Sequence, residues 1–291
     1  MKEPVVFVNG LFWPQSRAQV SVLDRGFSYG DGLFETLRSY KGTVFRLEDH
    51  LDRWAHSARL IFLELPMTRG ELRAAIYEPL ERNGLSDAII RLTVTRGEQA
   101  AGFSIDSEAP PTAVVHVRPF EALPGHLYAE GVAISLFSNS ASRIGGIHSQ
   151  IKSCNFLSQI VLRERARKEG SFEGIMIDDS QRIADGTTSN IFIVKDGGLK
   201  TPALNEFVLP GITRLAVLEL AQSLGIPCAE QALTAEDIYQ ADEVFLTSTG
   251  IEILPVREAD KRSIGIGEPG PITRRLRAMF LKTVEVSPLK R

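Results

Sequence analysis

The sequence predicts a protein of two domains, each mixing strands and helices in an α/β or α+β arrangement. Its 291 residues lie at the upper edge of what a single hydrophobic core supports. Strand-like and helix-like patterns occur in both halves, and a segment with two prolines and a glycine, "RPFEALPGH", separates them. We therefore expect a smaller domain over residues 1–118, a linker over 119–127 and a larger domain over 128–291.

The composition is that of an ordinary globular protein, with 43% hydrophobic and 24% charged residues. A net charge of −3 and the lack of a basic run argue against nucleic-acid binding. No apolar run approaches the roughly 20 residues that span a bilayer, and the first residues do not resemble a secretion signal. Cys154, Cys228 and five histidines show no ligand spacing. We expect a cytoplasmic protein with no structural metal and no membrane partner.

The N-terminal part predicts two hairpins, two helices and two further strands. The hairpins join "VVFV" to "LFW" through Asn9-Gly10, and "LFETLRSY" to "VFRL" through "KGT". "EDHLDRWAHSARLIF" has helical periodicity, and a second helix begins at Thr68, where Glu71 completes a capping-box pattern. "AIIRLTVT" and "TAVVHV" predict the strands. The buried helix faces should carry Leu51, Trp54, Ala55, Ala58 and Ile61, and then Leu72, Ala75 and Ile76.

The C-terminal part begins with a strand, "GVAISLF", and a loop rich in Ser and Gly. The strands "GIMI" and "NIFIV" flank "DDSQRIADGTTS", and "EVFLTSTG" predicts a buried strand that ends in a turn of small residues. "GITRLAVLELAQSLG" is an amphipathic helix that ends at Gly225. Another helix follows Lys152, and we expect it to face inward with Phe156, Leu157, Ile160 and Val161.

Lys152 is the only charged residue between Arg143 and Arg163. A lysine in such a segment can lay its stem on apolar neighbours and keep its ammonium in water. It can also point into a pocket that favours the neutral amine, as a nucleophilic or Schiff-base lysine requires. The stretch alone leaves both interpretations open.

Two turns of small hydroxyl residues are candidate anion sites. "PGITR" places Thr213 at the start of a helix, and "TSTG" places Ser248 and Thr249 at the end of a strand. Backbone N–H groups at a helix start bind anions readily, although Thr213 can equally be a helix cap and the second segment a plain turn. The nucleotide-binding and hydrolase motifs that would direct the function elsewhere are absent.

Six segments in order resemble the class IV pyridoxal-phosphate enzymes. This family, of fold type IV, includes branched-chain aminotransferases, D-amino-acid aminotransferases and aminodeoxychorismate lyases. The matching segments cover nearly the whole chain: "DRGFSYGDGLFETLR", "VFRLEDHLDRWAHSA", "IKSCNFLSQIVLRERARKEGSFEGIMID", "IADGTTSNIFIVKDGGLKTP", "LPGITRLAVLELA" and "ADEVFLTSTGIEILPV". The resemblance implies a two-domain fold like that of D-amino-acid aminotransferases, with pyridoxal 5'-phosphate bound by the larger domain.

The resemblance assigns roles to residues that the patterns left ambiguous. Lys152 falls on the family's Schiff-base lysine, which holds the cofactor as an aldimine and moves the proton between Cα and C4′. Arg46, in "VFRL", falls on the arginine that holds the cofactor phosphate. Further phosphate contacts are implied for Ile212, Thr213, Ser248 and Thr249.

Asp185 departs from the family pattern. The family usually has a glutamate at this position, where its carboxylate pairs with the pyridine nitrogen and keeps the ring an electron sink. Aspartate keeps the charge but is one methylene shorter, so the backbone must approach more closely, a water must intervene, or the ring is a weaker sink. Asp185 can also be only a turn residue beside Gly186.

The subfamily signals of the sequence disagree, and we expect an aminotransferase that acts on an amino acid and a 2-oxo acid. The alternative is aminodeoxychorismate lyase, because "TRGEQAAGF" has the spacing of that branch. A cofactor-holding protein without turnover is a more remote alternative. Family members are homodimers, so a homodimer is expected here. The candidate substrate residues are Tyr29, Phe34, Thr36, Arg38 and Arg96.

Overall fold

The computed structural model describes residues 3–99, 102–105, 109–138, 150–178, 180–204 and 207–286. The described residues form two compact units. The first comprises those within Met1–Glu121 together with Ile151–Asn155, and the second those within Ala122–Gln150 and Phe156–Val286. Ile151–Asn155, which the expected boundaries assign to the second domain, therefore lie with the first unit. The Ser- and Gly-rich loop expected before Lys152 lies within 139–149, outside the described residues.

The first unit contains a six-stranded antiparallel sheet in the order β2-β1-β6-β5-β3-β4. Both expected hairpins are present, with the two-residue turns Asn9-Gly10 and Lys41-Gly42 in the left-handed region, as tight hairpin turns require. The second return strand is only two residues long, because Arg46 also adopts positive φ and starts a helix. The strands are β1 (Val5–Val8), β2 (Leu11–Pro14), β3 (Gly32–Tyr40), β4 (Thr43–Val44), β5 (Ala88–Thr95) and β6 (Thr112–Pro119).

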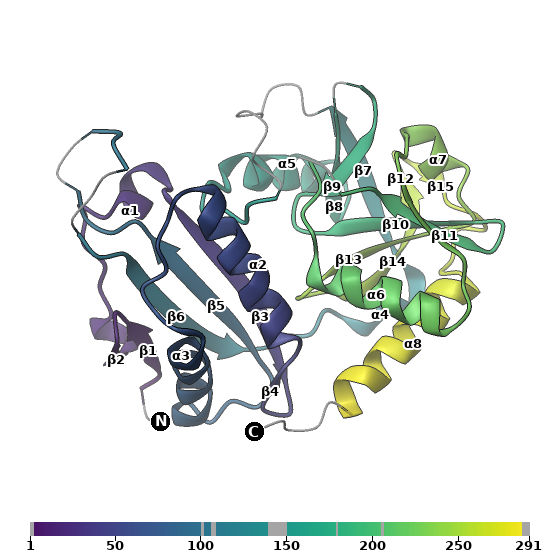
Figure 1. Ribbon diagram of the computed structural model, residues 1–291. Helices are drawn as coiled ribbons and strands as arrows, with labels where there is room; N and C mark the ends of the chain where they lie inside the picture. Colours follow the sequence, from purple (N-terminus) through teal and green to yellow (C-terminus); the bar gives the residue numbers. More distant parts are fainter. Residues whose placement is uncertain are drawn as a thin grey trace. The chain divides into compact units, whose positions relative to one another are not determined.

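Helices α2 (Leu47–Leu60) and α3 (Arg69–Arg82) pack on one face of this sheet (Figure 1). The expected capping box of Thr68 and Glu71 starts α3, and α2 buries Trp54 at the centre of the core. The odd-numbered residues Leu33 and Leu37 of β3 face the same core. Because side chains alternate along a strand, Phe34, Thr36 and Arg38 lie on the opposite face. Two short helices precede β3: η1 (Gln15–Arg17) and α1 (Arg25–Tyr29).

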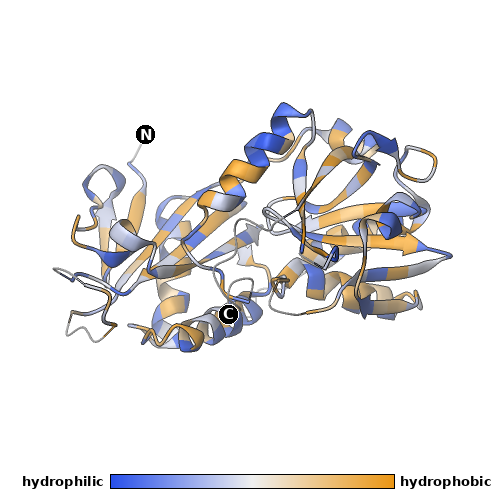
Figure 2. Ribbon diagram, turned by 90° about the horizontal axis from the view of Figure 1, so that it is seen from above, coloured by the Kyte–Doolittle hydropathy of each residue, from blue (hydrophilic) through white to orange (hydrophobic). Residues whose placement is uncertain are grey.

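The second unit contains a nine-stranded mixed sheet in the order β12-β11-β10-β13-β14-β7-β8-β9, with β15 paired to β14. The pairs β7–β8, β7–β14 and β11–β12 are parallel and the others antiparallel. Figure 2 shows hydrophobic residues, in orange, along strands of both units, interrupted by hydrophilic residues in blue. The strands are β7 (Val132–Ser138), β8 (Glu173–Ile177), β9 (Ile183–Gly186), β10 (Asn190–Lys195), β11 (Gly198–Pro202), β12 (Cys228–Gln231), β13 (Glu243–Ser248), β14 (Glu252–Ala259) and β15 (Arg262–Ser263).

Five helices in the described part of the second unit complete it. Helices α6 (Ile212–Ser223) and α8 (Pro271–Val286) contact each other and also β13 and β14. Helix α4 (Gly125–Glu130) contacts β14, and α7 (Ala235–Tyr239) has a capping box of its own. None of the helices described is long and apolar enough to cross a membrane.

Helix α5 (Leu157–Lys168) contradicts the expected inward face. Leu157, Ile160 and Val161 are 74%, 60% and 43% exposed in the single chain. The buried positions are Leu162 and Ala166 instead, one turn apart, and Leu162 packs with β8 and β9. The expected face is apolar, but none of the residues described here covers it.

Candidate active site

Lys152 lies beside β3 in an extended segment of the first unit. The Phe34 N–H donates to the Lys152 carbonyl at 2.9 Å, and the Cys154 N–H donates to the Gly32 carbonyl at 2.9 Å. These bonds extend the sheet by one short, irregular strand and fix the direction of the lysine. The half-buried Lys152 places Nζ 4.7 Å from the centre of the Phe34 ring.

Lys152 is isolated in the sequence but not in space. His50 of α2 is close enough that the charge of Lys152 lowers its pKa. His50 Nδ1 lies 2.8 Å from Glu35 Oε2, and Arg53 donates two hydrogen bonds to the same carboxylate, at 2.8 and 2.6 Å. All three side chains are buried. Sequence reasoning missed this group because no spacing motif links a strand glutamate to two helix residues.

Arg91 is a second basic residue of this region that sequence reasoning missed. It is paired with Thr36 across β3 and β5, and its guanidinium carbon lies 3.2 Å from the centre of the Phe34 ring. Burial lowers the pKa of Arg91, while charge interactions with Cys154 and Glu35 oppose this. Arg91 and Lys152 thus contact the same aromatic ring. Only the alternation of β5, which places Arg91 on the face away from the helices, could have indicated it.

Arg38 and Tyr29 lie in different surroundings. Arg38 is on the same face of β3 as Phe34, with its guanidinium against the rings of Tyr40 and Phe120, at 4.1 and 3.4 Å from their centres. Tyr29 closes α1, is 44% exposed and packs on Phe103, with 5.5 Å between the ring centres. Arg38 thus contacts the rings of Tyr40 and Phe120, and Tyr29 contacts the ring of Phe103.

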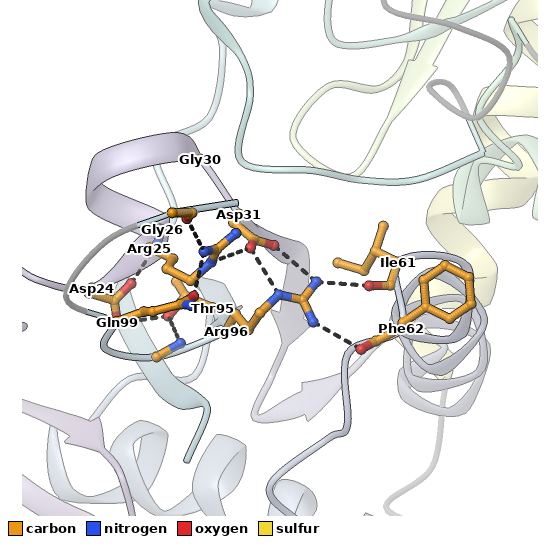
Figure 3. A network of polar contacts seen from close by, with 12 residues as sticks. Asp24, Arg25, Gly26, Gly30, Asp31, Ile61, Phe62, Thr95, Arg96 and Gln99 are labelled. Atoms are coloured by element: carbon orange, nitrogen blue, oxygen red, sulfur yellow. Dashed lines mark hydrogen bonds and ion pairs between the residues drawn. The ribbon is translucent and has the colours of Figure 1, made fainter. Parts of the chain in front are cut away.

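Arg96 belongs to a structural network (Figure 3). It donates to both carboxylate oxygens of Asp31, at 2.9 and 3.2 Å, and to the carbonyls of Ile61 and Phe62, at 2.8 and 2.9 Å. Arg25 donates to Asp31 at 2.7 Å from the other side. A guanidinium has five N–H groups, and Arg96 uses four of them here. This favours a structural role for Arg96 over the substrate role expected from the sequence.

We expect Asp31→Ala to lower the free energy of unfolding by about 3 kcal/mol, because it leaves two largely buried guanidinium groups without their carboxylate. Although burial opposes ionisation, the hydrogen bonds of Arg96 and Arg25 lower the pKa of Asp31. The stabilisation should therefore be present above the ordinary aspartate range and be lost as the pH falls through the lowered pKa. Chemical denaturation of the apo-protein measures this. The exposed Asp87 provides the control, and equal small losses for Asp87→Ala and Asp31→Ala would contradict it.

Asp185 lies in the second unit, in β9, where its carboxylate is fixed by two donors. Asn190 donates from Nδ2 to Oδ1 at 2.9 Å, and the Leu209 N–H donates to Oδ2 at 2.7 Å. Asn190 also donates to the Leu209 carbonyl at 2.9 Å. Asp185 is buried in the described unit, at 6% exposure, and the two donors hold its carboxylate in one orientation. A plain turn residue does not need this support.

The start of α6 is a candidate anion site in the same unit. Its N-cap is Gly211, and no side chain of the described residues caps the first N–H groups. A Cβ at Gly211 would meet Asn190 Oδ1 at 1.9 Å, so only glycine allows this approach. Ile212 and Thr213 are buried in the first turn. Ser248 ends β13, Thr249 follows it, and the preceding buried Thr247 hydroxyl has no partner among the residues that the structure describes.

Arg46, which the resemblance assigns to the cofactor phosphate, lies in the first unit at the start of α2. It is the N-cap of α2, with φ 48°, and its Nη1 donates to Asp49 Oδ2 at 3.1 Å in the first turn of the helix. Both side chains are partly exposed. The pairing keeps the guanidinium at the helix start, next to a neutralising carboxylate.

Comparison with known proteins identifies the family. The family model described as amino-transferase class IV matches residues 32–259. The chain belongs to the class IV aminotransferases. A Methanocaldococcus jannaschii protein named "Putative branched-chain-amino-acid aminotransferase" is 38% identical over 94% of each chain. A D-alanine aminotransferase of Bacillus licheniformis is 31% identical over 96% of each. A structure of the Escherichia coli branched-chain amino acid aminotransferase covers 97% of this chain and 94% of that chain, with a TM-score of 0.90 and 32% identity.

Class IV aminotransferases use pyridoxal phosphate, and a similar branched-chain amino acid aminotransferase structure contains pyridoxamine 5'-phosphate. The residues of this chain fit the cofactor. The cofactor's aldehyde needs an amine to bind it, and its phosphate needs an anion site. Its ring nitrogen needs a carboxylate that keeps the nitrogen protonated. Among the described residues of the first unit, Lys152 offers an amine. Within the second unit, taken by itself, the start of α6 and the Thr247 hydroxyl suit an anion, and the Asp185 carboxylate suits a ring nitrogen. No group of three His, Cys, Asp or Glu side chains suited to a metal occurs in the part of the chain that the structure describes.

Proposed function

We propose that Lys152 is the catalytic lysine of this class IV aminotransferase. In this proposal it binds the cofactor covalently and moves the proton during amino transfer between an amino acid and a 2-oxo acid. The observation that carries this is the pairing of Lys152 with β3, together with the position of its amine over the ring of Phe34, which Arg91 also contacts. When bound, pyridoxal phosphate supplies the electron sink that lets the Cα proton leave. The Lys152 amine takes that proton and returns it, as a positioned general base does.

Asp185 and the α6 start support the cofactor in this proposal. The Asp185 carboxylate holds the proton on the pyridine nitrogen, directly or through one water. The N–H groups of Ile212 and Thr213, with the hydroxyls of Thr213, Ser248 and Thr249, bind the phosphate. Free N–H groups at a helix start favour an anion through both hydrogen bonds and the helix dipole.

The phosphate arginine that we propose is Arg53, in place of Arg46. Arg53 is buried, is linked to His50 through the Glu35 carboxylate, and is held in one plane by Glu35. Arg46 is partly exposed and paired with Asp49. A charge-assisted bond is strongest where water is excluded, which favours Arg53.

Arg53→Lys is expected to weaken binding of pyridoxal phosphate by roughly tenfold or more, the size of one charge-assisted hydrogen bond. Lysine keeps the charge at this buried site but cannot keep the planar two-point contact. Arg46→Ala should leave the dissociation constant within about twofold, a difference well below that of one hydrogen bond. Fluorescence titration of the apo-protein measures both. If Arg46→Ala lost much of its cofactor affinity and Arg53→Lys lost none, the phosphate-binding role would belong to Arg46.

The substrate arginine that we propose is Arg91, with Arg38 as the second candidate. A substrate carboxylate needs a cation near the reacting amine, and Arg91 contacts the same ring as Lys152. Thr36, paired with Arg91, and Phe34 complete this group, whereas Tyr29 lies elsewhere on the first unit. Arg91→Met should therefore raise the KM for the amino acid far more than it changes cofactor affinity. Equal KM values for the variant and the parent would exclude Arg91.

The preferred substrates require a direct assay. We propose branched-chain L-amino acids with 2-oxoglutarate as the first pair, because the Methanocaldococcus jannaschii relative carries the branched-chain name. D-alanine with 2-oxoglutarate tests the activity named for the Bacillus licheniformis relative. Aminodeoxychorismate tests the lyase alternative, which the spacing from Gly97 to Gly102-Phe103 favours. Pyruvate release from aminodeoxychorismate without any amino transfer would replace the proposal by that alternative.

We propose further that the enzyme is a cytoplasmic homodimer. Apolar side chains are exposed on α5, at Leu157 and Ile160, and on the first unit at Phe27 and Phe103. Exposed apolar surface on this scale is typical of a subunit interface. Light scattering at a series of concentrations tests the dimer, and a monomer at all of them would contradict it.

A further inference from the structure

The carboxylate of Glu35 is a deeply buried charge that is hydrogen-bonded to His50 and Arg53 of α2. Its side chain is 1% exposed, and those of His50 and Arg53 are 2% and 7% exposed. Glu35 follows Phe34 in β3, and its partners lie three residues apart on α2. A carboxylate in this core is tolerated only because two donors are brought to it.

Burial and neighbouring charges shift the pKa values of Glu35 and His50. Burial opposes ionisation of Glu35, yet the Arg53 charge and the His50 hydrogen bond outweigh it and hold the pKa of the carboxyl well below its usual range. Burial lowers the pKa of His50, and Arg53 and Lys152 lower it further, against the opposing effect of Glu35. His50 is therefore neutral near pH 7. Because Glu35 is an acceptor, the His50 proton lies on Nδ1 and is donated to Oε2.

The geometry fixes the plane of the Arg53 guanidinium. Nε donates to Oε1 and Nη2 to Oε2, so the carboxylate and the guanidinium form a two-point pair. His50 donates to Oε2 as well, and so holds the carboxylate in the orientation that this pair needs. These hydrogen bonds together hold each of the three side chains in a single orientation.

We propose that Glu35 and His50 are positioning residues that orient the Arg53 guanidinium for the cofactor phosphate. The inference rests on the proposed role of Arg53. The neutral His50 imidazole orients the Glu35 carboxylate, and that carboxylate orients the Arg53 guanidinium. Neither contacts the cofactor in this account, so both act on cofactor affinity only through Arg53.

The test compares cofactor dissociation constants in a double-mutant cycle. His50→Leu removes the donor but keeps the bulk, whereas His50→Asn keeps an N–H that can reach Glu35. We expect His50→Leu to weaken pyridoxal-phosphate binding by about tenfold, as the loss of one hydrogen bond to a charged group does. His50→Asn should restore much of it. His56→Leu, on the exposed side of the same helix, is the matched control and should bind the cofactor like the parent.

The double variant His50→Leu/Arg53→Lys decides the mechanism of the effect. If His50 acts through Arg53, the double variant binds the cofactor as weakly as Arg53→Lys alone. The inference would be overturned if the double variant's loss of cofactor affinity were the product of the losses in the two single variants. A His50→Leu variant that loses stability in chemical denaturation but keeps its cofactor affinity would also overturn it.

Two controls keep the result interpretable. If His50→Leu does not fold, Glu35→Gln carries the same cycle, because it keeps the size and removes the charge that orients Arg53. An unchanged dissociation constant in Arg53→Lys would overturn the proposed role of Arg53 itself. A loss in Arg53→Lys with none in His50→Leu or Glu35→Gln would overturn only the positioning role.

Discussion

Replacing Lys152 by alanine is expected to abolish amino transfer. The variant loses the amine that takes and returns the Cα proton beside the Phe34 ring. The rate of amino transfer should fall by at least about ten-thousandfold. This is the upper end of what general acid–base catalysis contributes, and Lys152 also provides covalent attachment. Steady-state assay with the best amino donor measures the rate. The apo-protein should still bind the cofactor, because the phosphate contacts are separate.

Two matched variants show whether the loss is specific to the amine. Lys152→Arg keeps a positive charge but offers no amine of suitable basicity, so it should be as inactive as Lys152→Ala. Lys168→Ala, at the exposed end of α5, should be as active as the parent. Normal transamination by purified Lys152→Ala would exclude Lys152 as the catalytic residue.

Asp185→Asn is expected to lower the turnover number by about a hundredfold or more, if the charge on the ring nitrogen is worth a few kcal/mol in the transition state. The amide has the size of the carboxylate but cannot hold the ring proton. Cofactor affinity should fall much less, because the phosphate and Lys152 contacts remain. Parallel measurement of kcat and of the cofactor dissociation constant tests this split.

The network around Asp185 supplies the controls for this experiment. The amide introduced by Asp185→Asn would present an N–H to one of the two donors that now bind the carboxylate, so some local loss of stability is expected. Asn190→Ala removes one donor but keeps the negative charge of Asp185. It should therefore lower the turnover number much less than Asp185→Asn does. Asp185→Glu restores the usual family residue, and a near-normal rate would show that the ring lies at its usual distance. Parent-like turnover by Asp185→Asn would falsify the role of Asp185.

Local rules account for the parts of the fold that the sequence predicted well. Asn9-Gly10 and Lys41-Gly42 adopt the left-handed turns that two-residue hairpins need, and Thr68 with Glu71 starts α3. Each of these features depends on residues within four positions of one another. The two-unit α/β architecture follows from many such features together.

The wrong face of α5 and the open choice between two phosphate arginines both depend on packing between distant segments. The α5 sequence has two apolar stripes, and only contact with β8 and β9 shows that Leu162 and Ala166 form the buried one. Arg46 and Arg53 are both plausible from their positions in the sequence. Only the pairing of Arg53 with Glu35, eighteen residues away, distinguishes a buried guanidinium from an exposed one.

Motifs in the sequence mark some residues of the proposed site but not the residues that support them. Lys152 was indicated by its isolation in the sequence and by the resemblance. Asn190 fixes Asp185 and Arg91 contacts Phe34, yet each is an ordinary residue at the end or middle of a strand. Their roles depend on strand register and on side-chain direction, which single-residue patterns do not contain.

Covalent attachment at Lys152 is the central claim, and borohydride reduction of the holoenzyme tests it most directly. Reduction converts the bond between cofactor and lysine into a stable one, and peptide mass spectrometry then locates the attached pyridoxyl group. The account predicts a single modified peptide, with the group on Lys152 and none after the same treatment of Lys152→Ala. A pyridoxyl group on another lysine, or on none, would contradict it.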